Sequence, residues 1–165
     1  VVGDPLDDAT EIGPLAREDL MKELHAQVMD SVAKGAEIAF SGNPPEGKGF
    51  FYPPTILAGV KPGMRAYHEE LFGPVASVIE ARDLDHVVSV ANDTIFGLGA
   101  SVWTRDNLKG EEVAARVEAG AVFVNGQVKS DPRLPFGGVK GSGYGRELSH
   151  YGIKEFVNIQ TIWVK

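Results

Sequence analysis

Cysteine is absent from the 165 residues of the chain. Its absence excludes a disulfide scaffold, thiolate zinc sites, iron–sulfur ligation and a thiol nucleophile within these residues. Long apolar runs are missing too: no stretch approaches the roughly 20 residues that cross a bilayer, and the start lacks the pattern of a signal peptide. We therefore expect a cytoplasmic protein with no membrane partner.

Positive charge is scarce. Lys and Arg number 16 against 23 Asp and Glu, which gives a net charge of -7. Because nucleic acids attract proteins with a basic excess, we do not expect a nucleic-acid partner. The hydrophobic fraction of 43% is close to the average of soluble globular domains and excludes disordered and collagen-like classes. The first residue is Val1, so we treat the N-terminus as that of a processed product or of a piece of a longer protein.

The pattern of apolar residues predicts an α/β fold. Apolar residues recur at every fourth position from Leu20 to Val32, as in an amphipathic helix, and Gly35 suits the position just past its end. Strand and helix then alternate, which implies a mostly parallel sheet flanked by helices. The expected strands are 36–40, 75–81, 99–103, 121–124 and 156–165, and the further helices are 83–92, 104–119 and 149–155. Residues 50–60 are expected to be extended chain, in which Pro53 and Pro54 mark an edge or a bend.

Two segments outside the regular elements need separate interpretation. The last strand, 156–165, has no partner after it in the sequence, so it must pair with earlier chain or with another subunit. The glycine-rich segment 125–146 is a long loop, and such loops are commonly functional.

Two patterns that suggest ligand binding have simpler explanations. The segment 42–49 resembles a nucleotide P-loop, but Gly49 replaces the Ser or Thr that would hold magnesium, so we interpret it as a turn. His68 beside two glutamates is a lone imidazole without spaced partners, and a solvated surface is favoured over a metal site.

Two further segments are better candidates for a site. In 69–75, a charged pair leads into an aromatic residue, a glycine and a proline, and such a turn can hold Glu70 and Phe72 over a cleft. The equal alternative is a capped turn with Phe72 in the core. In 135–138, Phe136 stands beside glycines that permit close approach of backbone to a ligand, and core packing of Phe136 is the alternative.

These segments are also where the chain resembles the aldehyde dehydrogenase superfamily. The resemblance covers the whole length, in the order and spacing of the family's C-terminal series, at 2–6, 13–14, 69–75, 92, 96–98, 124–125, 135–138 and 142–147. Within the family, residues 145–152 and 16–20 are most similar to bacterial succinate-semialdehyde dehydrogenases.

The resemblance implies a reaction and indicates which part of the protein carries the catalytic groups. In the family, a Cys thiolate attacks the aldehyde, hydride passes to NAD or NADP, and a Glu base activates water. By the same resemblance these groups lie upstream of the present residues, so no catalytic residue is expected here and the chain alone is expected to be inactive. Residues 1–148 then form the C-terminal portion of the catalytic domain, and 149–165 form a short helix and an oligomerisation strand.

The resemblance also assigns two residues to the cofactor. Glu70 matches the carboxylate that accepts hydrogen bonds from the nicotinamide ribose, and Phe72 matches the ring beside it. A carboxylate suits this task because it only accepts and can take two neighbouring hydroxyls at once. Several family members have a ribose-binding Gln in the first helix where this chain has Leu20, so that contact is not expected here.

Two residues are assigned to the aldehyde substrate. Phe136 matches a ring that lines the aldehyde tunnel. Ser130 stands where succinate-semialdehyde enzymes place a hydroxyl for the substrate's far carboxylate, and Arg133 is an alternative that could pair with that carboxylate bidentately.

The leading hypothesis is therefore part of an NAD(P)-dependent aldehyde dehydrogenase, with succinate semialdehyde as substrate and a homo-oligomer formed through the C-terminal strand. A non-catalytic interaction or assembly module that retains the fold is the alternative. Phosphate-activated acyl reduction by a relative of the superfamily is a third hypothesis and requires a different upstream pocket.

Overall fold

The computed structural model describes residues 1–165 and divides into two compact units, Val1–Glu80 and Ala81–Lys165. Both units combine helices with strands, and of the three strand pairs two are parallel. The predicted α/β class with mostly parallel pairing is thus confirmed. None of the helices is long and apolar enough to span a membrane.

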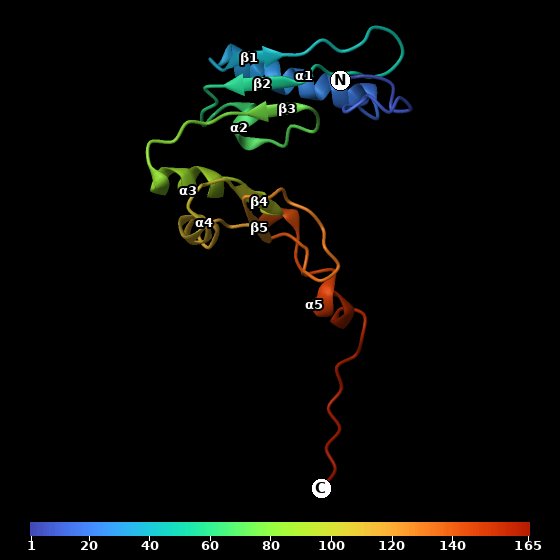
Figure 1. Ribbon diagram of the computed structural model, residues 1–165, viewed down its shortest axis with the longest axis vertical. Helices are drawn as coiled ribbons and strands as arrows, with labels where there is room; N and C mark the ends of the chain where they lie inside the picture. Colours follow the sequence, from blue (N-terminus) through green and yellow to red (C-terminus); the bar gives the residue numbers. More distant parts are fainter. The chain divides into compact units, whose positions relative to one another are not determined.

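The first unit is a three-stranded sheet with helices (Figure 1). Its strands lie in the order β1-β2-β3, with β2 antiparallel to β1 and parallel to β3. The helices α1 and α2 pack against each other. The elements are α1 (Glu18–Ala33), β1 (Glu37–Ser41), β2 (Thr55–Ala58), α2 (Arg65–His68) and β3 (Val75–Ser77).

The helix α1 follows its sequence pattern. Leu24 and Val28 of its apolar stripe are buried at 1% and 2% exposure, in one cluster with Leu57 of β2. The helix ends as predicted, because Gly35 takes a φ of +104°, which a residue with a side chain rarely adopts. Burial of this stripe fixes which face of α1 meets the core.

The first unit differs from the expectations in three places. Pro53 and Pro54 do not mark an edge, since β2 is the central strand; they precede it, outside the ladder, where their missing N–H groups cost nothing. The short helix α2 was not predicted, because four residues are too few to show a helical period. Beyond this, β3 is shorter than the predicted 75–81.

The second unit begins with a helix whose cap was readable in the sequence. The Asp83 carboxylate accepts from the His86 amide at 2.8 Å at the start of α3 (Leu84–Asn92), as its predicted cap. The strands β4 (Gly99–Val102) and β5 (Ala121–Val124) then pair in parallel. Between them lies α4 (Asn107–Ala114).

The helix α4 is shorter than the predicted 104–119. Its start is delayed because Thr104 donates its amide to the Asn125 side chain at 2.9 Å, and with Asp106 as its cap the helix begins at Asn107, three residues after the expected start. The glycine-rich stretch is a long loop as predicted, interrupted only by the 3-10 turn η1 (Lys140–Ser142) and followed by α5 (Ser149–Lys154). The start of α4 thus depends on a contact with Asn125, which follows β5.

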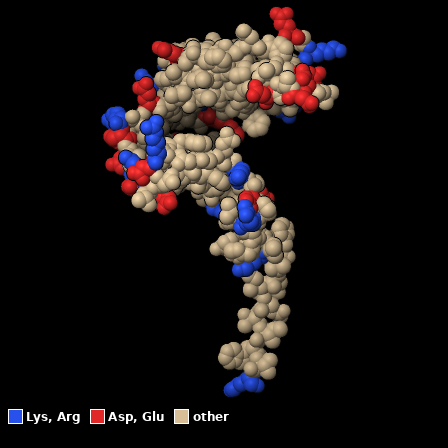
Figure 2. All heavy atoms as spheres, in the orientation of Figure 1, with Lys and Arg blue, Asp and Glu red and all other residues tan.

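The C-terminal segment 156–165 is not a strand in this structure, which corrects the expectation that it pairs with earlier chain. Its apolar side chains are exposed, with Ile162 at 80% and Trp163 at 84%. Its only charged residue is the terminal Lys165, and in Figure 2 the extended segment is drawn in tan up to a blue end. Pairing with another subunit stays a prediction.

Candidate functional site

The bend that follows α2 carries the first pair of candidate residues. Glu69 ends the helix by donating its amide to the Arg65 carbonyl at 2.9 Å. Within the bend, Gly73 donates to Leu71 and Val75 donates to Gly73, at 2.9 and 2.8 Å. The sheet also holds the bend, because Thr55 of β2 donates to the Pro74 carbonyl at 2.9 Å.

Gly73 brings this bend close to the core. A Cβ added there would lie 2.5 Å from Leu24 Cδ2 and 3.3 Å from a methyl group of Leu15, which is closer than side chains pack. Only a glycine lets the backbone approach the α1 face this closely. The bend therefore lies on a rigid support rather than in a free loop.

The carboxylate of Glu69 is fully engaged. Arg65 binds it through Nε at 2.8 Å and Nη2 at 2.6 Å, and Gln27 donates its Nε2 to the same carboxylate at 2.9 Å. Hydrogen bonds from Arg65 and, to a smaller extent, from Gln27 lower the pKa of Glu69 to about 2. His68, Glu69 and Glu70 are all exposed, as the predicted solvated surface requires, and Glu69 in addition belongs to an ion pair. His68 accepts from the Gly63 amide at 3.0 Å, and no His, Asp and Glu cluster could hold a metal ion.

Glu70 and Phe72 are presented to solvent. Phe72 is 66% exposed, so the alternative that places its ring in the core is wrong. Glu70 is exposed, and its carboxylate has no hydrogen-bond or ion-pair partner; only its backbone carbonyl is bound, by Gln27 at 3.1 Å. The bend therefore offers a carboxylate with its acceptor capacity free beside an exposed aromatic ring.

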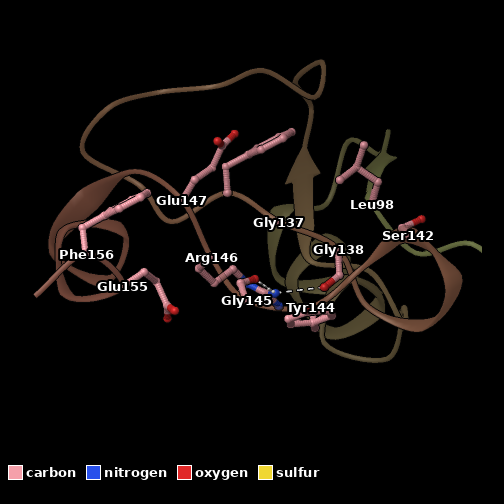
Figure 3. A pocket seen from close by; sticks show the side chains of 11 residues that line it. Leu98, Gly137, Gly138, Ser142, Tyr144, Gly145, Arg146, Glu147, Glu155 and Phe156 are labelled. Carbon is pink, nitrogen blue, oxygen red and sulfur yellow. Dashed lines mark hydrogen bonds between the residues drawn. The ribbon is translucent and has the colours of Figure 1, made fainter. Parts of the chain in front are cut away.

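The second unit contains a pocket of about 450 Å³ beside the glycine-rich loop (Figure 3). The Arg146 guanidinium shapes it by donating Nη1 to the carbonyls of Gly138 and Gly145 at 2.9 and 2.6 Å. Phe136 lines this pocket, and its backbone exchanges two hydrogen bonds with Glu147 at 2.9 and 2.8 Å. These hydrogen bonds tie residues 136–138 to residues 145–147.

Phe136 also lines a second pocket, of about 370 Å³, along β5. Lys129 and Asp131 line the same pocket, and Ser130 between them is exposed. Phe136 is only half-buried. Its ring therefore belongs to pocket walls rather than to the buried core.

Arg133 already has a carboxylate partner. Its Nε and Nη2 bind the two oxygens of Asp131 at 2.9 and 2.6 Å, which holds the pKa of Asp131 well below its usual range. The side chain of Arg133 is 84% exposed. Ser130 and Arg133 both stay predictions for the substrate's partner, and Arg133 would have to exchange its exposed ion pair with Asp131 for the substrate carboxylate.

The candidates lie in two segments, one in each unit. Glu70 and Phe72 share the bend of the first unit, and Ser130 and Phe136 share the loop of the second. Leu20 is half-buried on α1 and has no polar group to offer a ribose. Sequence reasoning missed Gln27, although a Gln one position before Val28 on the apolar stripe was a readable sign of a buried polar contact.

Comparison with known proteins now defines the class. Residues 1–162 match the aldehyde dehydrogenase family. The chain belongs to this family, and the predicted resemblance is confirmed.

The similar relatives are much longer than this chain. It is 51% identical to the succinate semialdehyde dehydrogenase [NAD(P)+] Sad of Escherichia coli (strain K12), over 98% of this chain and 35% of that protein. It is 50% identical to a succinate-semialdehyde dehydrogenase [NADP(+)] 1 of Mycobacterium ulcerans (strain Agy99), over 99% and 36%. The chain thus spans about a third of the length of the curated relatives it matches.

Solved structures agree with this assignment. The succinic semialdehyde dehydrogenase from Streptococcus pyogenes in complex with NADP+ is 37% identical with a TM-score of 0.93, over 99% of this chain and 36% of that one. The Mycobacterium tuberculosis aldehyde dehydrogenase complexed with NAD+ is 38% identical with a TM-score of 0.88, over 94% and 32%.

Proposed function

We propose that this chain is part of an NAD(P)-dependent aldehyde dehydrogenase that oxidises succinate semialdehyde to the acid. The observation that carries the proposal is the free carboxylate of Glu70 beside Phe72, on a bend fixed by the core. Relatives about 50% identical that are named for this substrate support the choice of aldehyde.

Glu70 fits the cofactor chemically. Ribose hydroxyls are donors, and a carboxylate whose oxygens are unpaired accepts two of them. When bound, the nicotinamide supplies the acceptor for hydride. Glu70 would fix the position of the ribose, and the ring of Phe72 would cover an apolar face beside it, so that the protein holds the reacting groups in one geometry.

The loop of the second unit would hold the substrate. Phe136 offers an apolar wall that excludes water, and the exposed hydroxyl of Ser130 can donate to the far carboxylate of succinate semialdehyde. Since the chain has no cysteine, the thiol nucleophile must be supplied from outside these residues. We accordingly propose that the chain alone is inactive.

A chimera tests this proposal. The chain by itself, given NADP+ and succinate semialdehyde, is expected to show no rise in nicotinamide absorbance. Joined to the remaining two thirds of the Escherichia coli relative, it is expected to oxidise succinate semialdehyde, and to prefer it over butanal, which lacks the carboxylate. Turnover by the chain alone would refute the mechanism. A folded chimera that oxidises neither aldehyde would refute the function.

We also propose that residues 156–165 join a second copy of the chain as a paired strand. The segment has unpaired backbone groups and exposed Ile162 and Trp163, and strands with free edges recruit partners. The alternative function, a non-catalytic assembly module, shares this prediction but requires no cofactor binding.

Acidic substitution in this segment tests the assembly. Ile162→Asp is expected to lower the oligomeric state measured by sedimentation, because a charge would face the apolar contact. Leu6→Asp is the matched control, since Leu6 is 92% exposed and lies outside the segment. An unchanged assembly in the Ile162 variant, or an equal loss in the control, would exclude the segment as the contact.

A further inference from the structure

Gln27 is a buried polar residue on the apolar face of α1. Only 6% of it is exposed. Its Nε2 makes two hydrogen bonds, to the Glu69 carboxylate at 2.9 Å and to the Glu70 carbonyl at 3.1 Å. A buried amide is unfavourable unless it is bonded, so burial at this position depends on the bend being where it is.

Two helices hold the same carboxylate. Gln27 reaches Glu69 from α1, and Arg65 reaches it from α2 while also pairing with Glu23 of α1. Glu69 thereby has little freedom to rotate. The residue that follows it in the chain is Glu70.

The backbone conformation at Glu69 determines the direction in which the Glu70 side chain points. Glu69 has extended backbone angles, φ −103° and ψ 156°. In extended chain, successive side chains point to opposite sides. When Gln27 holds the Glu69 side chain and the Glu70 carbonyl against α1, the Glu70 carboxylate is directed away, toward solvent, as its exposure shows.

We propose that Gln27 is a positioning residue for Glu70 and, through it, for the nicotinamide ribose. This inference rests on the proposed function, because it assigns Gln27 a role in catalysis only if Glu70 binds the cofactor. The competing explanation is that Gln27 merely completes the packing of α1.

A double-mutant cycle in the active chimera separates the two explanations. Gln27→Met keeps the length and volume of the side chain and removes both N–H donors. It is expected to lower kcat/KM for the cofactor about tenfold, as the loss of two hydrogen bonds at a positioned group implies. In a Glu70→Gln background the same change is expected to have less than about a twofold effect, because residues that act as one unit are not additive.

A measurement of local order accompanies the kinetics. Amide hydrogen exchange at Gly73 and Val75, whose hydrogen bonds define the bend, is expected to speed up in Gln27→Met. Ala26→Leu is the control, since Ala26 is the exposed neighbour on the same helix. If Gln27→Met does not fold, Gln27→Leu, which also lacks the donors and adds no charge, takes its place.

The outcomes are distinct. Equal losses for Gln27→Met in both backgrounds, or no loss in the first, would overturn the inference while leaving Glu70 in the site. No loss for Glu70→Gln alone would overturn the role of Glu70 in the proposed function, and the positioning role with it.

Discussion

Replacing Glu70 by Gln in the active chimera is expected to slow hydride transfer at least about tenfold while the protein stays folded. The substitution removes the charge and one of two acceptor oxygens, and hydrogen bonds to a charged acceptor are roughly twice as strong as neutral ones. A ribose held by one weaker contact leaves the nicotinamide free to leave its reactive geometry. The measurement is the single-turnover rate of nicotinamide reduction, with protonated and deuterated aldehyde.

Glu37→Gln is the matched control, because Glu37 is an exposed glutamate of the same unit, on β1, away from the bend. It is expected to leave the rate and the isotope effect unchanged. An unchanged rate in Glu70→Gln, together with unchanged cofactor affinity, would remove Glu70 from the site. Unfolding on substitution is not expected, since no hydrogen bond or ion pair of the Glu70 carboxylate supports the fold.

Among the glycine-to-alanine substitutions in the second unit, Gly120→Ala is expected to cause the largest loss of stability. The new Cβ would lie 1.7 Å from the Gly137 carbonyl oxygen and 3.1 Å from the Gly138 Cα. These are backbone atoms, so no side-chain rotation relieves the overlap and the loop must shift. We expect a loss of about 3 kcal/mol in the free energy of unfolding, at the upper end of overpacking effects.

Gly126→Ala provides the comparison for this substitution. A Cβ there would have no neighbour closer than 3.9 Å, and Gly126 does not have a positive φ. It is expected to change stability by no more than about 0.5 kcal/mol. Chemical denaturation of both variants measures the difference. Equal stabilities would mean that the loop containing Gly137 is not packed against Gly120 in solution.

Local sequence signals predicted elements where local chemistry decides them. The α1 stripe, the Gly35 stop and the Asp83 cap each depend on neighbours within one or two turns, and each is as expected. The extent of α4 could not be predicted, because Asn125, far along the chain, holds Thr104 outside the helix. Segment 156–165 shows the same limit, since β-propensity alone cannot supply a pairing partner.

In the candidate site, too, local features were predictable from the sequence and contacts between distant residues were not. Positions 70, 72 and 136 were identifiable as candidates from short motifs. Their supports were not: Gln27 lies 42 residues from Glu69, and Gly73 meets Leu24 across the core, so only folding reveals either contact. The ion pair between Arg133 and Asp131 was likewise not foreseen from the sequence.

The hydrogen bond between Thr55 and Pro74 couples the geometry of the bend to the register of the sheet. Pairing of Thr55 with Val75 places the end of the bend at a fixed step of the β2–β3 ladder. A slip of one residue in that ladder would displace the chain by about 3.3 Å and exchange its two faces. If Glu70 binds the cofactor as proposed, its reach toward the ribose depends on the register between β2, the central strand, and β3 at the edge of the sheet.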